Sequence, residues 1–131
     1  MSKYFFESSA FTKRYKQEDG SNFIDQIFSN NNDLFYLNLA ILEVRKVIFR
    51  LWKNPQNQDA QINEEEYNAL ESRFASDIQN MKRVEFTEEM INKSLQILEE
   101  ASANQAWIKT SFDLAQITAY LTIKDEYNDL L

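Results

Sequence analysis

The sequence predicts a single α/β domain built as a three-layer α/β/α sandwich around a small central parallel sheet. Three short runs of good strand propensity, "KYFF" (3–6), "LFYLN" (34–38) and "RVEF" (83–86), alternate with longer segments whose apolar residues repeat at three- and four-residue steps. Gly and Pro occur once each, which favours long ordered segments. Because parallel neighbours need crossover connections, this alternation predicts helices on both faces of a parallel sheet.

The first strand is followed directly by a helix signal, which is the usual opening of an α/β unit. Ser8 or Ser9 is expected to cap a short helix over "AFTKRY" (10–15). A second helix is expected to begin at Gly20 and Ser21, because apolar residues recur after them at helical spacing. Those residues are Phe23, Ile24, Ile27 and Phe28.

The segment from Leu39 to Lys53 follows the second strand and predicts a helix. Its apolar stripe consists of Ile41, Val44, Ile48 and Leu51. Since Leu42 and Phe49 lie well off that stripe, we expect this helix to be mostly buried. The polar run "NPQNQDAQIN" (54–63) holds the only Pro and is expected to form a surface loop.

Three further helices are indicated in the second half of the chain. One carries an apolar stripe at Tyr67, Leu70, Phe74 and Ile78. Another starts at Thr87, whose Thr-x-x-Met pattern lacks the second half of a capping box. The last runs from about Ser111 through Leu114, Ile117, Leu121 and Ile123, with Ser111 as its expected cap.

The composition excludes several kinds of chemistry. The chain contains neither Cys nor His, so it lacks the residues of Ser-His-Asp and Cys-His nucleophilic sites and the preferred ligands of zinc. No segment approaches the roughly 18 apolar residues of a membrane span, and we expect a soluble cytoplasmic protein. The net charge of −7 argues against a broad electrostatic grip on nucleic acid, so any such contact should be local or metal-assisted.

Three carboxylates stand out by their surroundings. Glu7 closes the first strand, Glu43 borders the apolar face of its helix, and Asp113 lies in the first turn of the last helix. Each has an ordinary alternative: a strand-end residue facing water for Glu7, a pair with Lys46 for Glu43, and stabilisation of a helix terminus for Asp113. Ligands of parallel α/β sheets gather beyond the carboxyl ends of the strands, where Glu7 is expected to lie.

The order and setting of these acids resemble a known pattern. "YFFESSAFTKRY" resembles the opening of the PIN domain, especially of VapC-type toxins, where a strand ends in Asp before Ser or Thr, Ser, Ala and a short helix. "LNLAILEVRKVIFRL" resembles the second motif of that family, a strand followed by a helix with an internal Glu. "SFDLAQITAYL" resembles the third, in which an Asp opens a helix. The resemblance covers about residues 4–131.

The resemblance implies a metal-dependent endoribonuclease that is neutralised by a cognate antitoxin and forms a homodimer. Its metal ligands and catalytic residues would be Glu7, Glu43 and Asp113, holding Mg²⁺ or Mn²⁺. These ions prefer hard oxygen ligands and require neither His nor Cys, so the composition agrees. The ion would also let an acidic pocket accept an RNA phosphate, and Lys13 and Arg14 could hold the RNA backbone, with a solvated charge pair as the alternative.

Two departures from the family pattern leave other functions open. Glu7 stands where the family usually has Asp, and the last residues, "YNDLL", stand where a further strand and a fourth Asp would follow. We therefore expect a domain over residues 1–131 that lacks the C-terminal strand and leaves an edge of residues 3–6 unpaired. The alternatives are a catalytically impaired or inactive PIN-like module that binds a partner protein, and a mainly helical interaction module.

Overall fold

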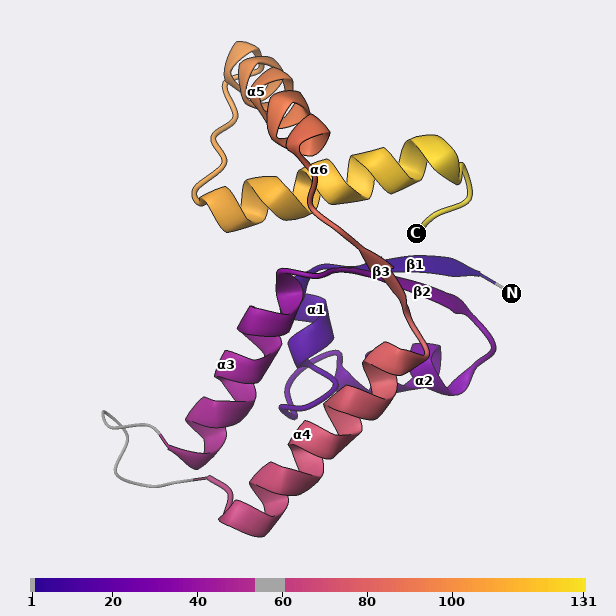
Figure 1. Cartoon of the computed structure of the whole chain (residues 1–131), viewed down its shortest axis with the longest axis vertical. Coiled ribbons are helices and arrows are strands. Elements are labelled where there is room, and N and C mark those ends of the chain that lie inside the picture. Colours follow the sequence, from indigo (N-terminus) through magenta and orange to yellow (C-terminus); the bar gives the residue numbers. More distant parts are fainter. Residues whose placement is uncertain (1, 54–60) are drawn as a thin grey trace.

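The computed structural model describes residues 2–53 and 61–131. Three layers are stacked in it, with a small sheet between two groups of helices (Figure 1). Most of the expected surface loop over residues 54–63 lies outside the described residues. Among the described residues, no helix is both long and apolar enough to span a bilayer.

The sheet is parallel, as the sequence predicts, with strand order β1-β2-β3. Phe6 on β1 aligns with Tyr36 on β2, and Leu37 on β2 aligns with Val84 on β3. The third strand starts one residue earlier and ends two residues earlier than the "RVEF" run. The bounds of the strands are Lys3–Phe6 for β1, Asp33–Leu37 for β2 and Lys82–Val84 for β3.

In the described part of the chain, six helices cover the two faces of the sheet, which confirms the α/β/α architecture. One face carries α1 (Ser8–Thr12), α2 (Ser21–Ser29), α3 (Ala40–Trp52) and α4 (Glu64–Gln79). The other carries α5 (Glu88–Ala103) and α6 (Ser111–Glu126). In Figure 1 the first group lies below the sheet and the second above it.

The core below the sheet is built around Phe11 of α1, which is fully buried. Its ring contacts those of five other aromatic residues, with centroids 5.5–6.2 Å apart, and aromatic pairs at such distances add to the stabilisation from burial alone. These neighbours are Phe6, Tyr15, Phe28, Tyr36 and Phe74. One side chain of the shortest helix therefore joins β1, β2, α2 and α4.

A polar network closes the rim of this core. Arg14 pairs with Asp77 at 3.1 Å and with Asp25 at 3.0 Å, and the Tyr15 hydroxyl donates to Asp77 at 2.6 Å. Burial, reinforced by the hydrogen bond to Asp77, raises the pKa of Tyr15 above its ordinary value of 10.0, which keeps the hydroxyl protonated as a donor. Because the Arg14 and Asp77 side chains are only 15% and 12% exposed, removing one partner would leave an unpaired charge in a poorly hydrated place.

The outer edge of β1 is partly covered by the end of the same chain. The Phe5 N–H donates to the Leu131 carbonyl at 3.0 Å, and the Leu131 N–H donates to the Lys3 carbonyl at 2.8 Å. Leu130 forms a parallel bridge with Lys3 and is 1% exposed. The expectation of a wholly unpaired edge at residues 3–6 is therefore wrong, because the last residues begin to pair there as a strand would.

Some residues expected in the core are exposed. Leu42 and Phe49 on α3 are 67% and 47% exposed, and Phe23 on α2 is 61% exposed. The expectation that α3 is mostly buried is therefore wrong. The buried stripe of α3 is Ala40, Val44, Ile48 and Leu51, and Ile41 packs partly against the same core, while the opposite side of the helix faces outward.

The position of Phe11 predicts a large loss of stability on truncation. Phe11→Ala should lower the free energy of unfolding by about 3–5 kcal/mol, because it removes a fully buried ring and leaves a cavity. Phe23→Ala is the matched control on an exposed position and should change it by less than about 0.5 kcal/mol. Urea unfolding followed by circular dichroism measures both, and equal effects would contradict this description of the core.

Candidate functional site

The carboxyl ends of the strands form one edge of the molecule, from which helices begin on both faces. α1 starts directly after β1, α3 starts after β2, and α6 starts above the same edge (Figure 1). Glu7 is the N-cap of α1, and Glu43 and Asp113 lie in the first turns of α3 and α6. Each acid is therefore at a helix start, where free N–H groups and the helix dipole favour negative charge.

Glu7 has a local structural function. Its Oε2 accepts from the Ser9 N–H at 3.0 Å and its Oε1 from the Ala10 N–H at 2.6 Å, so Glu7 caps α1. The expectation that Ser8 or Ser9 is the cap is wrong, because the chain turns one residue earlier and places Glu7 in the extended conformation of an N-cap. A carboxylate has about four acceptor positions, so each oxygen keeps a lone pair for another ligand.

Gln116 connects the start of α1 to α6. Its Oε1 accepts from the Ser8 N–H at 2.7 Å, and the side chain is buried, at 6% exposure. Sequence reasoning gave this residue no role, although a polar side chain among the buried positions Ala115 and Ala119 was an available signal. Asp113 precedes Gln116 by three residues and therefore lies about one turn earlier on the same side of α6.

Asp113 itself is exposed at the start of α6. The helix is capped by Thr110, whose Oγ1 accepts from the Asp113 N–H at 3.0 Å. The expectation that Ser111 is the cap is therefore wrong by one residue. Because Thr110 supplies the cap, the Asp113 carboxylate is not needed for it.

Glu43 is half-buried on α3, and α1, which Glu7 caps, packs against α3. Among the described residues, no ion pair joins Glu43 to Lys46, while the neighbouring Arg45 pairs with Glu71 at 3.2 Å. The pair with Lys46, which would be the ordinary explanation for Glu43, is therefore not formed in the described part of the chain. Glu43 remains a carboxylate close to the start of a helix at the strand-end edge.

The three acids share this edge without forming a compact group. Within residues 2–53 and 61–131, no three acidic side chains are gathered closely enough to make a ready cation site. Their chemistry still fits a hard divalent ion, because they are carboxylates on separate elements and Mg²⁺ binds through few protein ligands while keeping several waters. The assignment of Glu7, Glu43 and Asp113 as metal ligands stays a prediction.

Asn38 is a further polar residue at this edge, directly after β2. Its Nδ2 donates to Glu85 at 2.9 Å, while its Oδ1 is buried and has no partner in the described part of the chain. Buried acceptors are usually hydrogen-bonded, so this oxygen has capacity for one more donor or for a cation. Sequence reasoning missed it because it treats Asn38 as the last residue of the second strand and gives it no role of its own.

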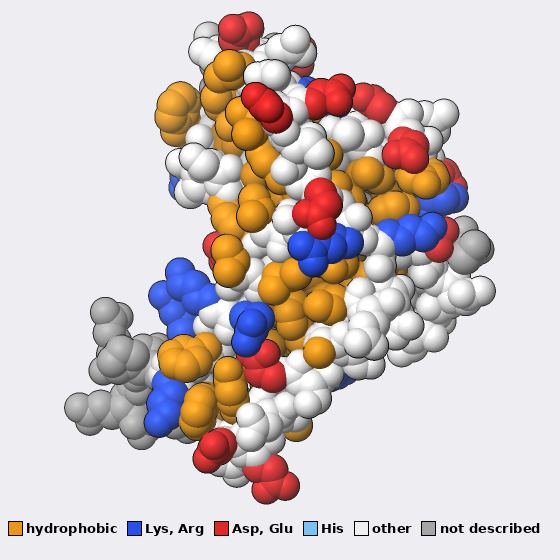
Figure 2. Space-filling view, viewed as in Figure 1, with side chains coloured by type: hydrophobic (Ala, Val, Ile, Leu, Met, Phe, Trp, Pro, Cys, Tyr) orange, Lys and Arg blue, Asp and Glu red, His pale blue; other side chains and the backbone are white. Residues whose placement is uncertain are grey.

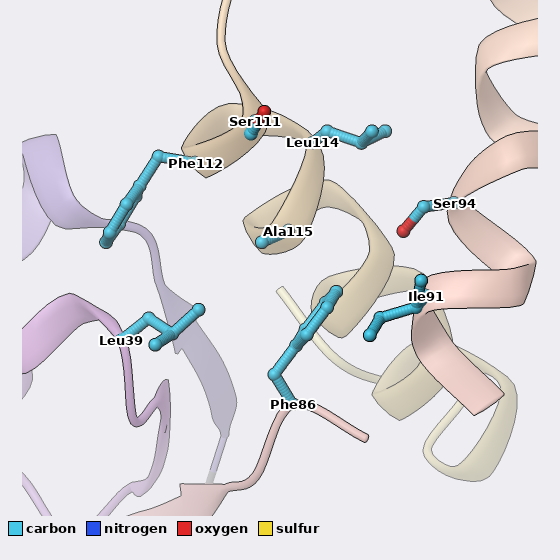
Figure 3. A pocket seen from close by; sticks show the side chains of 8 residues that line it. All are labelled: Leu39, Phe86, Ile91, Ser94, Ser111, Phe112, Leu114 and Ala115. Carbon is cyan, nitrogen blue, oxygen red and sulfur yellow. The ribbon is translucent and has the colours of Figure 1, made fainter. Parts of the chain in front are cut away.

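An apolar pocket of about 330 Å³ lies between the start of α3 and the α5–α6 pair. Figure 3 shows Leu39 and Phe112 on one side of it and Phe86 and Ile91 on the other. Figure 2 shows the molecule hollowed on the left, between these upper and lower helices. Leu39 precedes α3 and Phe112 precedes Asp113, so the pocket adjoins the elements that carry two of the three acids.

Comparison with solved structures gives close agreement in fold. The chain matches VapBC2 from Rickettsia felis, solved bound to a DNA fragment from its promoter, with a TM-score of 0.61 and 11% identity over 92% of this chain and 81% of that one. It matches Mycobacterium tuberculosis VapC20, described as a sarcin-ricin loop cleaving toxin, with a TM-score of 0.61 and 11% identity over 93% and 83%. The chain has the PIN-domain fold of VapC toxins. No family model and no curated protein sequence matches it.

The VapC-like fold uses Arg14 differently from the sequence-based expectation. Arg14 was considered for holding an RNA backbone, with a solvated charge pair as the alternative. Its guanidinium is instead engaged by Asp25 and Asp77 and lies over the ring of Phe28 at 4.4 Å. Arg14 is therefore a structural residue of the core rim: the charge-pair alternative is confirmed in its pairing, but the side chain is only 15% exposed and not solvated.

The Ser8–Gln116 hydrogen bond of the VapC-like fold predicts a specific effect of mutation. Gln116→Ala should lower the free energy of unfolding by about 1–3 kcal/mol, because the buried Ser8 N–H loses its acceptor. Gln96→Ala, on the exposed side of α5, is the matched control and should change it by less than about 0.5 kcal/mol. Hydrogen exchange of the Ser8 amide adds a local readout, and unchanged protection in Gln116→Ala would contradict the bond.

Proposed function

We propose that this protein is a metal-dependent endoribonuclease of the toxin–antitoxin type. It would hydrolyse RNA phosphodiesters with Mg²⁺ or Mn²⁺ bound by Glu7, Glu43 and Asp113. The observation that carries the proposal is the 2.7 Å hydrogen bond from the Ser8 N–H to Gln116, which ties the helix of Asp113 to the strand end that carries Glu7. The VapC-like fold, shared with a protein described as a sarcin-ricin loop cleaving toxin, supports it.

The carboxylates have distinct tasks in this proposal. Glu7 is oriented by the Ser9 and Ala10 N–H groups, so little side-chain freedom is lost when it binds a ligand. Asp113 is exposed and held at the start of α6, and Glu43 approaches from α3. When bound, a divalent ion supplies charge neutralisation for the phosphate and acidifies water that attacks phosphorus.

The partners follow from the same proposal. RNA is the substrate, a cognate antitoxin masks the site, and two copies form a homodimer in the cytoplasm, where RNA is available. Exposed apolar side chains on α5 and in the loop before α6 support protein contacts there: Ile91 is 54%, Leu95 61% and Trp107 80% exposed. Apolar side chains exposed in this way favour burial against another protein.

A second candidate function is a PIN-like module that binds its partner without cleaving RNA. It is favoured by the engagement of both Glu7 oxygens in capping and by the absence, among the described residues, of a compact acidic group. In this function Glu7 would serve the fold, and the antitoxin-type partner would still bind. Intact RNA after incubation with metal, together with retained binding of the partner, distinguishes it from the nuclease.

The nuclease proposal predicts metal-dependent cleavage that requires the acids. End-labelled RNA should be cut with Mn²⁺ or Mg²⁺ and left intact with EDTA. Asp113→Asn and Glu43→Gln should each slow cleavage at least roughly a hundredfold, since loss even of outer-sphere partners of a metal costs ten- to a hundredfold. Asp125→Asn, near the other end of α6, is the matched control and should retain the wild-type rate. Cleavage that persists with EDTA or in Asp113→Asn would exclude this mechanism.

Substitution of residue 7 is predicted to raise the rate of cleavage, whereas the substitutions of Asp113 and Glu43 lower it. Glu7→Asp should increase the rate of cleavage, because it withdraws the carboxylate by on the order of 1 Å and removes a rotor from a site where Mg²⁺ demands near-octahedral geometry. The cap of α1 should survive, since Asp is a preferred N-cap residue. Initial rates at saturating Mn²⁺ measure the change, with the unfolding midpoint as the check on the fold. A lower cleavage rate in Glu7→Asp would contradict this prediction and would show that Glu suits the site better than Asp.

A further inference from the structure

The outward side of α3 is an unusual surface for this protein. Phe49 and Leu42 are 47% and 67% exposed there, and Arg45, Lys46 and Arg50 are exposed beside them. We call these five residues the α3 face. Figure 2 shows blue and orange side chains gathered at the lower left, where Figure 1 places α3.

The charge of this segment is opposite to that of the whole protein. Residues 42–53 contain four cations, Arg45, Lys46, Arg50 and Lys53, and one carboxylate, Glu43, which gives a net charge of +3. Because the whole chain carries −7, the remaining residues carry −10. The positive charge of this segment attracts an anionic partner, while the negative charge of the remaining surface repels it.

The cations of the α3 face are only partly neutralised. Arg45 pairs with Glu71 at 3.2 Å. In the two described ranges, no carboxylate lies within ion-pairing distance of Lys46 or Arg50. Two exposed positive charges one turn apart on a rigid helix, separated by about 6 Å along its axis, are therefore available to an anionic ligand.

Phe49 is held in place while its ring stays accessible. Trp52 and Tyr67 stack on each other with centroids 4.4 Å apart, and Phe49 meets both at steep angles, with centroids at 6.1 Å and 6.3 Å. The ring therefore has a fixed support and remains 47% exposed. An aromatic side chain between cations is the combination on which single-stranded nucleic acids bind, through base stacking and phosphate contacts.

The α3 face is continuous with the candidate catalytic acids. Lys46 follows Glu43 by three residues and Arg50 follows it by seven, which places both on the same side of the helix, one and two turns further along. A single-stranded RNA with one phosphate near Glu43 could thus continue along α3 without crossing the acidic surface.

We propose that the α3 face binds the backbone and one base of single-stranded RNA next to the candidate cleavage site. Lys46 and Arg50 contact phosphates, and a base stacks on Phe49. The inference rests on the proposed function in taking RNA as the ligand, and it adds the surface that holds the RNA. An acidic peptide is the competing ligand, since Leu42 is also exposed here, but an accessible ring fixed between cations favours a nucleobase.

The test measures RNA binding without cleavage. A single-stranded 12-nucleotide RNA, labelled at one end, is titrated with protein in EDTA at 50–200 mM salt and followed by fluorescence anisotropy. Lys46→Gln and Arg50→Gln should each weaken binding and reduce the slope of log affinity against log salt by about 0.7, the value for one contact with a single strand. Phe49→Leu should weaken binding about tenfold and leave the slope unchanged.

Lys82→Gln is the matched control. Lys82 is exposed at the start of β3, at the end of the sheet away from the carboxyl ends of the strands, and it pairs with Asp33 at 3.5 Å, so its loss should leave the slope unchanged. The proposal would be overturned if Lys82→Gln and Lys46→Gln changed the salt slope of RNA binding equally, or if neither changed it. It would also be overturned by a poly-glutamate peptide that binds through Lys46 and Arg50 and displaces no RNA.

The two proposals can fail separately. If RNA is bound through the α3 face but never cleaved with Mn²⁺, the α3 proposal stands and the nuclease assignment fails. If RNA is cleaved while binding is insensitive to Lys46, Phe49 and Arg50, the nuclease assignment stands and the α3 proposal fails. Circular dichroism and unfolding midpoints of each variant show whether its fold is intact.

Discussion

The hydrogen bond between the Ser8 N–H and Gln116 joins the two helical layers at the strand-end edge. Ser8 belongs to α1 below the sheet and Gln116 to α6 above it. Apolar contacts hold α6 against the sheet, but such contacts are non-directional and leave its rotation poorly fixed. A buried directional bond restricts that rotation, because breaking it would leave a polar group unpaired away from water.

The helix starts at the strand-end edge also explain how an acidic protein accommodates three acids there. Glu7, Glu43 and Asp113 each lie at the start of a helix, so the local N–H groups and dipoles offset their charge. The α3 face extends from this edge with charge of the other sign. One helix thus carries a carboxylate in its first turn and cations beyond it.

Much of the fold could be predicted from the sequence because local signals and tertiary structure agree. The three strand runs, the α2 start at Ser21 and the Thr87 cap of α5 are confirmed. The errors in the helix caps are at places where two adjacent residues could both serve. Glu7 caps α1 in place of Ser8 or Ser9, and Thr110 caps α6 in place of Ser111, because the exact turn of the chain decides which side chain faces the free N–H groups.

The sequence by itself determined the α/β alternation, the parallel sheet and the candidate acids, because periodicity and strand propensity are local properties of the chain. Only the tertiary structure decided that Leu42 and Phe49 are exposed, that Arg14 is committed to Asp77 and Asp25, and that Gln116 meets Ser8. These facts depend on which elements lie against each other. Burial and pairing depend on two surfaces that meet. The sequence of one segment specifies only one of those two surfaces.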